Sequence, residues 1–572
     1  MKRLYLLTFM AVFLLAGCSG SGSSPKGGKP DQPPPGSPKD FTREERLKYS
    51  ETLVALFDDF YAPLSWKEDL NSLAYDDISE SLLGKARRTV IQEEDFLSSL
   101  FSFIASFDDA HVSLAILSPK SAELPVSFEA IGDDIVVREV DRSILSESEF
   151  PFYPGDLLKS FDGMTTEKLL EELGRYETFG YEPAQRRWLA RRISSRAGAY
   201  QPEVPEGVAK LKIHSWMRDD DEDVSLSWLT WGNEEESLTH PSTPIKNFKS
   251  APIEKNPLDI LRQGVPSWIR GQAEDFETFE PFFSVWNNFK SRYSSEESVY
   301  YSGTFMLEGK TIGFLRIPSW MPADPSEDLD FLSKEIAFYE KNTDALIIDQ
   351  TNNLGGNICF GELFAGFFIN EPIQSVIFQI RTSDIWTQQL EMMVEYSCEE
   401  EGSNDCIVAK NFLSAIDEAA ARGDELTNPM PLCAYDGTIY PFVDANHKTI
   451  TYTKPVMMLN NEISMSTADM VPAILQDAGR VTMFGSRTMG AGGSVQGVSI
   501  GDDEDWFITI TQALAVRPNE IETQDGIRTR YLENIGVEPD IQYLITLDDF
   551  FSDYVLYRNA VDQSILSLLD QE

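Results

Sequence analysis

Residues 454–496 read KPVMMLNNEISMSTADMVPAILQDAGRVTMFGSRTMGAGGSVQ and place Ser466 where a buried strand is expected to turn into a helix. Pro455–Leu459 is a short apolar run bounded by asparagines, which predicts a strand, and Thr467–Ala478 has helical apolar spacing before Gly479 ends it. The free backbone N–H groups and the positive dipole end of a helix start can stabilise an oxyanion. The pattern therefore suggests Ser466 as a nucleophile for acyl transfer.

The same residues also fit a helix cap. Ser466-Thr467-Ala468-Asp469 has the form of a capping box, in which the serine side chain accepts a hydrogen bond from the first turn of the helix. Taken alone, the segment favours this structural interpretation, so the case for catalysis depends on the rest of the chain.

Composition excludes several classes of function. The chain has 572 residues, with 93 acidic against 48 basic residues and a formal charge of −45. This length suggests about two to four domains. The negative field repels nucleic acid, which is not expected as a partner. The four histidines, His111, His214, His240 and His447, show no tight metal-ligand spacing, so neither a metal nor a cofactor is expected.

The N-terminus has the form of a bacterial lipoprotein signal. Lys2 and Arg3 precede an apolar run that ends in Leu15-Ala16-Gly17-Cys18, a tetrapeptide that resembles a lipobox. The run is too short to span a bilayer comfortably, so residues 1–18 are predicted to be a signal peptide and lipobox, with Cys18 lipidated after cleavage. An ordinary secretory peptide is the alternative. The expected location is the cell envelope, with the outer membrane preferred because Ser19 is not an aspartate.

Composition shifts divide the remaining chain into segments. A linker rich in Gly, Ser and Pro covers 19–40, and a helical region at 41–118 places His111 in the loop before a strand. Short strands and the turn at Tyr153–Gly163 predict a PDZ-like domain at 119–215, followed by an acidic and proline-rich insertion at 216–300. Strands alternate with helices at 301–545, which predicts an α/β core, and 546–572 is a C-terminal helix.

Four cysteines remain besides Cys18. Cys398 and Cys406 bracket a polar loop and are close enough to pair locally, but the sequence leaves their pairing with each other or with Cys359 and Cys433 open.

Two glycine-containing turns follow predicted strands of the core. Leu346–Gly356, LIIDQTNNLGG, frees the N–H groups of Gly355 and Gly356 to approach a substrate as half of an oxyanion hole, or it is a plain strand-to-helix loop. Gly490–Gly493, GAGG, either contacts the substrate backbone or only makes a tight turn.

The order of these motifs, LIIDQTNNLGG, PVMMLNNEISMSTADMVPAILQDAG, VTMFGSRTMGAGG and ENIGVEPDI, resembles the C-terminal processing peptidase and tricorn protease family of serine peptidases. The most similar branch is that of the chlamydial protease-like activity factor. The resemblance implies an α/β fold with a crotonase/ClpP-like ββα core, an N-terminal helical region and a PDZ-like domain. It puts the nucleophile on the middle serine of Ser464–Ala468, which is Ser466, and leaves Ser464 as the neighbour to rule out.

The resemblance also implies the partners of the nucleophile. Many processing peptidases use a lysine in the turn that follows the nucleophile helix, but Ala491 stands at that position. The tricorn-like branch instead takes a histidine far upstream, which matches His111, and an imidazole of ordinary pKa can remove the Ser466 proton at neutral pH. The glutamate of the ENxGV motif falls on Glu533 and would orient the imidazole.

These residues together predict a serine endopeptidase. Ser466 would form the acyl-enzyme, with His111 as general base, Glu533 as orienting acid, and the N–H groups of Thr467 and of Gly355 or Gly356 as oxyanion donors. Protein or peptide substrates are expected as partners, and the resemblance adds a homodimer and maturation by cleavage within 216–300. The alternative is a catalytically inactive, peptide-binding surface lipoprotein of the same fold. A structural adhesin is less favoured, because it gives no reason for the three residues to occur together.

Overall fold

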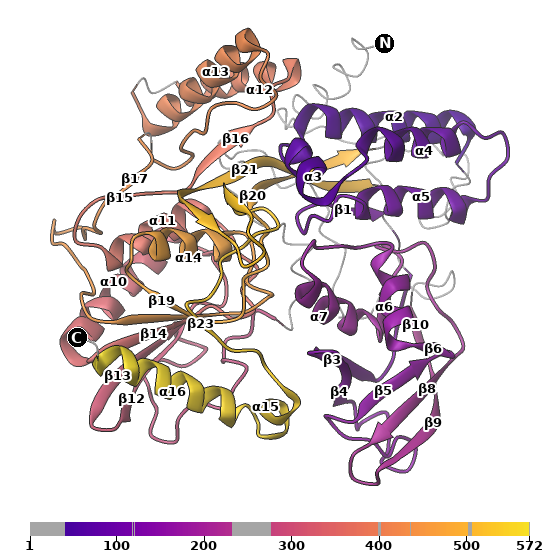
Figure 1. Cartoon of the computed structure of the whole chain (residues 1–572), viewed down its shortest axis with the longest axis horizontal. Coiled ribbons are helices and arrows are strands. Elements are labelled where there is room, and N and C mark those ends of the chain that lie inside the picture. Colours follow the sequence, from indigo (N-terminus) through magenta and orange to yellow (C-terminus); the bar gives the residue numbers. More distant parts are fainter. Residues whose placement is uncertain are drawn as a thin grey trace, which may run out of the picture.

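The computed structural model describes residues 41–116, 118, 120–231, 276–398, 402–434, 436–500 and 506–570 (Figure 1). The predicted signal peptide, lipobox and linker, with Cys18, lie outside these residues, as does the middle of the predicted insertion. Within the described residues, no helix is both long enough and apolar enough to cross a membrane.

Four helices form the N-terminal region, as its periodicity predicts. They are α2 (Arg43–Phe60), α3 (Leu64–Asn71), α4 (Tyr75–Ala86) and α5 (Glu93–Ala105). Thr42 and Glu45 close a capping box at the start of α2, and Leu53 and Phe57 bury its apolar stripe. Figure 1 shows these helices in indigo, stacked beside one end of the core.

An antiparallel sheet with two helices follows the helical region (Figure 1). Its strand order is β3-β4-β5-β8-β9, with β6 paired to β5. The elements are β3 (Val126–Ile131), β4 (Asp134–Val140), β5 (Leu157–Phe161), β6 (Met164–Thr165), α6 (Thr166–Gly174), α7 (Glu182–Arg192), β8 (Val208–Ser215) and β9 (Asp220–Ser227). The strand and turn predicted at Tyr153–Gly163 appear as β5 and β6, and the likeness to a PDZ domain stays a prediction.

The boundary predicted at residue 216 lies inside this sheet. β9 pairs with β8 along its whole length, from Val208↔Ser227 to Ser215↔Asp220. A three-stranded sheet then joins β10 (Leu229–Trp231), β2 (Ser121–Glu123) and β7 (Ser195–Ala197). Residues 216–231 therefore belong to the sheets, and their acidic composition reflects the exposed position of β9.

The core is a seven-stranded sheet, mostly parallel, with helices on both faces. Its order is β11-β12-β13-β14-β18-β19-β23, and the strands from β13 to β23 pair in parallel. The strands are β11 (Lys290–Ser291), β12 (Tyr301–Leu307), β13 (Lys310–Arg316), β14 (Ala345–Asp349), β18 (Val456–Asn460), β19 (Thr482–Gly485) and β23 (Ile541–Gln542). The predicted α/β core is confirmed.

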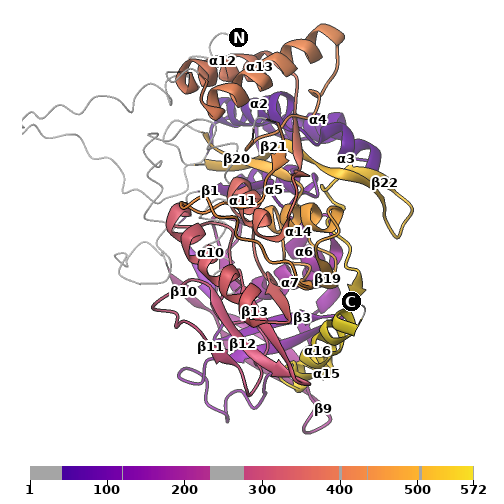
Figure 2. The same ribbon diagram turned by 90° about the vertical axis from the view of Figure 1, so that its left-hand side faces the viewer.

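Alternate residues of each buried strand pack on opposite faces of this sheet. Leu346 and Ile348 lie in one apolar cluster with α10 (Pro325–Asn342), α11 (Ile358–Ala365) and α14 (Thr467–Asp477), whereas Ile347 lies in another with α16 (Val555–Asp570). Figure 2 shows α16 on the side of the sheet away from α11 and α14. A fully buried strand such as β14 therefore reads as a continuous apolar run.

A second sheet connects the N-terminal helices to the core. Its centre is the long strand β21 (Trp506–Glu522), which pairs with β1 (Ser113–Ile116), β16 (Ile377–Ile380), β20 (Gly493–Ile500) and β22 (Arg528–Tyr531). The β1–β21 pairing fixes the loop that carries His111 against the core. The remaining elements are η2 (Gly366–Phe368), β15 (Ile373–Gln374), α12 (Asp384–Ser397), α13 (Asn404–Arg422), β17 (Thr438–Ile439) and α15 (Leu547–Phe551).

Candidate active site

Ser466 lies on a strained turn between β18 and α14. Its φ is 59° and its ψ is −119°, a combination that costs a non-glycine residue about 1–3 kcal/mol. Such a conformation persists only where the surroundings enforce it, and it is typical of a nucleophile held at a sharp strand-to-helix turn. The side chain is only 2% exposed.

The side chain of Ser466 does not cap its helix. It makes no capping hydrogen bond with the first turn of α14. The Asp469 carboxylate, the other half of the expected capping box, interacts with the Ser466 backbone N–H and accepts hydrogen bonds from the Gly490 N–H (2.8 Å) and the Ala491 N–H (3.0 Å). The Ser466 side-chain half of the predicted capping box is therefore not formed, and no hydrogen bond among the described residues occupies the Ser466 hydroxyl.

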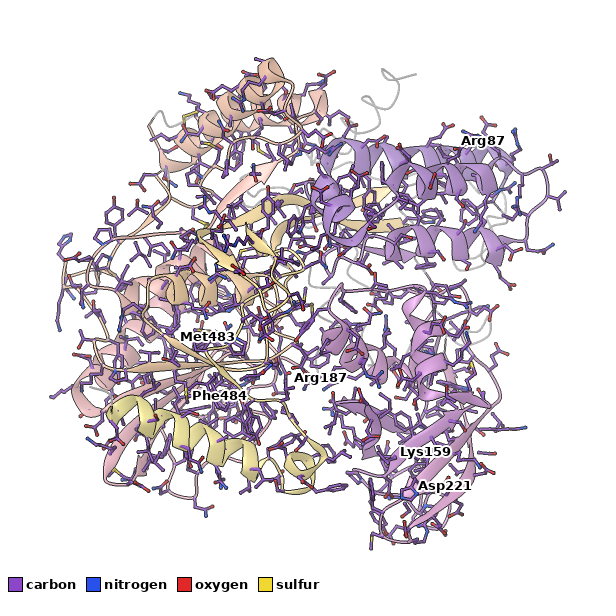
Figure 3. All side chains as sticks on the ribbon, in the orientation of Figure 1. Arg87, Lys159, Arg187, Asp221, Met483 and Phe484 are labelled. Carbon is purple, nitrogen blue, oxygen red and sulfur yellow. A yellow bond between two sulfur atoms is a disulfide. The ribbon has the colours of Figure 1, made fainter. Side chains whose placement is uncertain are left out.

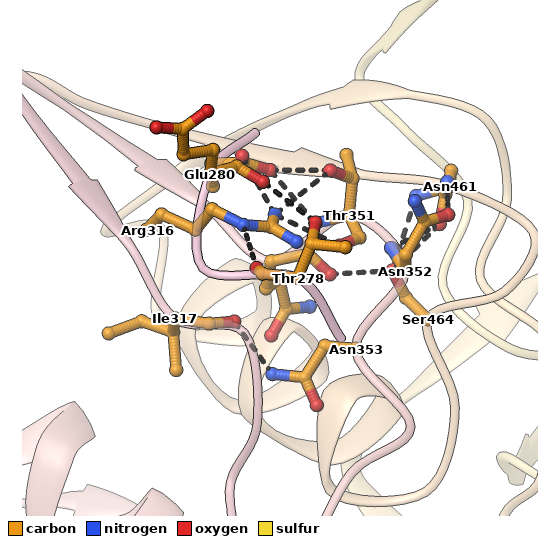
Figure 4. Close-up of polar contacts among 11 residues, drawn as sticks. Thr278, Glu280, Arg316, Ile317, Thr351, Asn352, Asn353, Asn461 and Ser464 are labelled. Carbon is orange, nitrogen blue, oxygen red and sulfur yellow. Dashed lines mark hydrogen bonds and ion pairs between the residues drawn. The ribbon is translucent and has the colours of Figure 1, made fainter. Parts of the chain in front are cut away.

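Ser464, the rival serine, has a structural role. Its hydroxyl donates to the Gln350 carbonyl at 3.0 Å and accepts from the Asn461 N–H at 3.2 Å (Figure 4). These bonds tie the turn after β18 to the residues that follow β14, and the Ser464 side chain is fully buried. The Ser464 hydroxyl is therefore engaged in holding the fold, whereas the Ser466 hydroxyl has no hydrogen-bond partner among the described residues.

The glycine loop after β14 is rigid. The Asn353 side chain donates to the Ile317 carbonyl at 2.9 Å (Figure 4). Its amide oxygen accepts the Gly355 N–H at 2.7 Å. The Arg316 guanidinium, paired with Asp349 at 2.9 Å, holds the start of the loop, and both side chains are fully buried. The polar side chains of the loop and of the flanking strands therefore fix its conformation.

Gly355 and Gly356 bring this loop against the nucleophile. Gly355 has φ 86°, and a Cβ atom on it would lie 2.6 Å from the Ser466 Cβ and 2.9 Å from the Thr467 nitrogen. Gly356 accepts the Thr467 hydroxyl at its carbonyl, at 2.9 Å. The Gly355 N–H is taken by Asn353, whereas no hydrogen bond of the described part of the chain uses the N–H groups of Gly356 and Thr467.

His111 lies in the loop between α5 and β1, as predicted. It is fully buried, and neither ring nitrogen has a hydrogen-bond partner among the described residues. Burial lowers the pKa of His111 to about 4, with Lys67 lowering it further and the Asp109 carboxylate opposing the shift. The imidazole is therefore neutral at pH 7, the form that accepts a proton.

Asp109 fixes the backbone of the histidine loop. Its carboxylate accepts the His111 N–H at 2.8 Å, the Tyr61 hydroxyl at 3.0 Å and the Thr511 hydroxyl at 2.7 Å. These bonds come from the residue that ends α2, from the loop itself and from β21, so the position of His111 is determined by three separate segments.

Glu533 is paired with a lysine that the sequence did not single out. Its Oε1 lies 2.6 Å from Lys67 Nζ, and its Oε2 accepts the Gly492 N–H at 2.8 Å. Burial, and then the Asp109 carboxylate, raise the pKa of Glu533, and Lys67 lowers it. No hydrogen bond among the described residues joins Glu533 to His111, or His111 to Ser466.

Hydrogen bonds nevertheless connect the three segments. Asp469, one turn after Ser466, binds the turn at Gly490 and Ala491, and the Gly490 carbonyl accepts the Asn534 N–H at 2.7 Å. The Asn534 side chain donates to the Asp108 carbonyl at 2.9 Å, next to the histidine loop. The segments that carry Ser466, Glu533 and His111 are therefore held together, and their side chains are 2%, 1% and 0% exposed.

The site also contacts the antiparallel sheet through Arg187, which Figure 3 shows between that sheet and the core. Its guanidinium pairs with Glu129 of β3 and with Glu462, each at 2.9 Å, and Glu462 precedes Ser466 in the same turn. The Ser486 hydroxyl donates to Glu462 at 2.7 Å. Arg187 therefore joins β3 to the turn that carries Ser466, and these ion pairs anchor the antiparallel sheet to that turn.

Residues 276–278, which lie within the predicted insertion, pack against the site. The Phe276 ring stacks on Trp188 at 5.6 Å. The Glu277 carboxylate accepts the Leu354 N–H at 3.3 Å, and the Thr278 carbonyl accepts from Arg316 at 3.0 Å (Figure 4). Segment 276–278 therefore packs beside the glycine loop.

Two site residues escaped prediction. Asp469 appears in the sequence only as part of a capping box, and Lys67 is one lysine of the predicted helical region, with no local pattern to mark it. Lys67 is identified only by its contacts with the loop at 533–534, which is far from α3 in the sequence.

Part of the chain matches a known peptidase family. Residues 311–543 match the family described as Peptidase family S41. This range contains Gly355, Gly356, Ser466 and Glu533, whereas His111 lies upstream of it.

Relatives and solved structures extend the similarity to nearly the whole chain. A protein of Chlamydia pneumoniae is 27% identical over 606 residues, 94% of this chain and 92% of the relative. The crystal structure of mature CPAF has a TM-score of 0.72 at 24% identity and covers 93% of this chain and 98% of its own. Mature CPAF complexed with lactacystin has a TM-score of 0.70 at 24% identity and covers 93% and 99%. The overall fold is therefore shared.

Proposed function

Because residues 311–543 form a peptidase family S41 domain, we propose that the protein is a serine endopeptidase in which Ser466 attacks the peptide bond. The observation that carries this assignment is the strained, uncapped Ser466 at the start of α14. The Ser466 hydroxyl makes no structural hydrogen bond, so a role in stabilising the fold does not explain the backbone strain. A catalytic role does explain it.

The proposed mechanism gives each residue of the site a role. Its Oγ adds to the substrate carbonyl carbon while its proton passes to the neutral imidazole of His111. The N–H groups of Thr467 and Gly356 hold the oxyanion, with Gly355 engaged by Asn353. The imidazolium protonates the departing amine. Water then attacks the acyl-enzyme while His111 accepts its proton, and His111 returns that proton to the leaving Ser466 Oγ. The Glu533 carboxylate stabilises the imidazolium.

We further propose that cleavage within residues 216–300 precedes full activity. The support is the closed site, with Ser466 and His111 almost without exposure, and the packing of segment 276–278 against the glycine loop. A cut in the chain on one side of segment 276–278 would release this segment from the glycine loop and so open the site. Full activity of an intact chain would contradict this part of the proposal.

The cellular setting is a proposal from the sequence alone. Lipidation of Cys18 would anchor the peptidase to the cell envelope, with the outer membrane preferred, and residues 19–40 would hold it away from the bilayer. Metabolic labelling with a fatty acid, compared between wild type and Cys18→Ala, tests the anchor.

A second candidate is a peptide-binding lipoprotein of the same fold without catalysis. The absence of a hydrogen bond from His111 to Ser466 or Glu533 among the described residues favours it. In that protein the strain at Ser466 would have no chemical use, so cleavage would be absent from every form of the chain.

Casein cleavage by a soluble form that begins at residue 41 tests the two candidates. Wild type, Ser466→Ala and Ser464→Ala are compared, before and after limited proteolysis of the 216–300 segment. We expect cleavage by wild type and by Ser464→Ala, loss in Ser466→Ala, and inhibition of wild type by lactacystin, since mature CPAF with lactacystin has the same fold. Unchanged cleavage by Ser466→Ala would overturn the site assignment, and no cleavage by any form would favour the binding protein.

A further inference from the structure

Lys67 lies at the centre of the site, although the proposed reaction does not use it. Its side chain is fully buried, and its Nζ lies 2.6 Å from Glu533 Oε1. The same ammonium donates to the Asp108 carbonyl at 2.8 Å and to the Asn534 side-chain oxygen. The ammonium therefore contacts three acceptors, two of them through hydrogen bonds and Glu533 through a close ion pair.

The three acceptors belong to the two segments that carry His111 and Glu533. Asp108 stands three residues before His111, in the loop that Asp109 fixes. Asn534 follows Glu533 and donates its N–H to the Gly490 carbonyl. The Lys67 ammonium is thus the shared contact between the histidine loop and the glutamate loop.

Stability alone is a weak reason to bury this pair. Removing an ammonium and a carboxylate from water costs several kcal/mol each, and apolar replacement of a buried ion pair is often neutral or stabilising. α3 is a short helix whose other buried residue, Leu64, packs in an ordinary apolar cluster. A buried charge at this position therefore points to the site it contacts.

We propose that Lys67 is a positioning residue of the peptidase, whose ammonium holds the Glu533 carboxylate and the His111 loop at the separation that the reaction requires. The inference rests on the proposed function, because it assigns a role within the same site. Lys67 contacts neither substrate nor the reacting atoms and acts through Glu533 and His111.

The charge of Lys67 also acts on the base. The titratable and polar groups that face this cluster come from the end of α2, from α3, the histidine loop, β21 and the glutamate loop: Tyr61, Trp66, Asp108, Asp109, His111, Thr511, Glu533 and Asn534. Among them the ammonium of Lys67 opposes protonation of His111 and the Asp109 carboxylate favours it. Loss of the ammonium should therefore move the acidic limb of the activity profile to higher pH.

The test compares Lys67→Met and Lys67→Arg with wild type in the cleaved, active form. Lys454→Met is the matched control. Lys454 is a partly buried lysine whose Nζ donates to the Glu340 carbonyl (2.6 Å) and to the Thr343 carbonyl. It lies before the start of β18, whereas Ser466 follows the end of that strand. Each variant is titrated with a fluorophosphonate to count reactive serines, and kcat and KM are measured per reactive serine from pH 4 to 9. Ser466→Ala serves as the blank.

We expect kcat of Lys67→Met to fall by about tenfold or more, with KM nearly unchanged and the acidic limb at higher pH, as for loss of an interaction used in the transition state. Lys454→Met should differ from wild type only in melting temperature. If Lys67→Met does not fold, Lys67→Arg is the deciding variant, because it keeps the positive charge but changes the position of that charge relative to Glu533.

Two outcomes would overturn the inference. Folded Lys67 variants with wild-type kcat and an unmoved acidic limb would leave Lys67 as a structural residue while the proposed function stands. Absence of any Ser466-dependent cleavage in wild type would remove the proposed function, and the inference with it.

Discussion

Gly355 packs so closely against Ser466 that a Cβ atom on the glycine would lie 2.6 Å from the Ser466 Cβ. The glycine also has φ 86°, which side chains rarely adopt. The contact fixes the distance between the glycine loop and the start of α14, and so the width of the space in which an oxyanion would form.

We therefore predict that Gly355→Ala abolishes cleavage. The added methyl group must push the Ser466 turn or the loop aside, because the atoms it meets belong to Ser466 and to the backbone of Met465 and Thr467. Casein cleavage per folded molecule is the measurement.

The chain offers a matched control at Gly309. This glycine has φ 83°, and a Cβ atom on it would meet nothing within 4 Å. Gly309→Ala carries the same backbone strain, of about 1 kcal/mol, without the clash. Equal losses of activity in the two variants would show that strain, and not the contact with Ser466, is responsible.

Asp469 leads to a prediction about stability and pH. Burial raises the pKa of this carboxyl to about 6, above the 3.8 of an ordinary aspartate, although hydrogen bonds from Thr488, Gly490 and Ala491 oppose the shift. Between these two values the folded state holds a proton that the unfolded state releases, so the Asp469 contribution to unfolding free energy falls as pH rises from about 4 to about 6.

Asp469→Asn removes that titration. We expect the unfolding free energy of wild type to fall relative to the variant by up to about 3 kcal/mol between pH 4 and pH 6.5, because the pKa of Asp469 differs by about two between the folded and unfolded states. Urea unfolding at both pH values measures it. A difference between the proteins that does not change with pH would contradict the assignment.

The sequence predicted elements whose signal is local. β14 is a run of apolar residues buried on both faces, and α14 has apolar spacing ended by a glycine, so both appear where the pattern places them. The edge strand β9 was missed because its first four residues are acidic and exposed, which hides the alternation of a strand.

The residues of the candidate site also fall into two groups, those with a local sequence signal and those without one. The place of Ser466 at a strand-to-helix turn could be predicted from one contiguous segment, but its missing side-chain cap could not, because that segment alone favours a capping box. Glu533 and His111 were singled out by motifs of the resembling family. The Lys67–Glu533 pair could not, because it depends on how the N-terminal helices dock on the second sheet. The engagement of the Gly355 N–H by Asn353 was also hidden, since an asparagine in a loop has many acceptable partners.

His111 predicts an unusual pH profile. Because burial lowers the pKa of the imidazole to about 4, the base stays neutral well below pH 6.5. We expect kcat/KM to hold from pH 7 to about pH 5 and to fall with a midpoint near the lowered value, measured with an uncharged peptide substrate. A midpoint near 6.5, that of a solvated imidazole, would show that the histidine loop is open in the active enzyme.

The same shift affects stability with the opposite sign to Asp469. Between about pH 4 and pH 6.5 the unfolded state binds a proton at His111 that the folded state does not, so this contribution to stability rises with pH. His111→Gln should remove it, which pairs of urea midpoints at pH 4.5 and pH 7 can detect. A wild-type difference that the variant retains would assign the titration to another group.

The two disulfides should contribute unequally. Cys359–Cys433 joins residues separated by 74 positions, whereas Cys398–Cys406 joins residues separated by 8. Loop-closure entropy then predicts losses of about 4 kcal/mol for the first and about 2.5 kcal/mol for the second. Cys359 also stands in the first turn of α11, where its N–H donates to Asn357, the residue after Gly356. Only the Cys359–Cys433 bond is thus coupled to the glycine loop.

Paired serine variants test this directly. Cys359→Ser with Cys433→Ser should lower both the unfolding free energy and kcat, because α11 and the preceding glycine loop lose their covalent anchor. Cys398→Ser with Cys406→Ser is the matched control and should lower stability less and leave kcat near wild type. Its bond joins the end of α12 to the first turn of α13. Thermal unfolding and casein cleavage under oxidising conditions measure the two effects. An equal loss of kcat in both double variants would mean that the disulfides act through global stability and not through the loop beside Ser466.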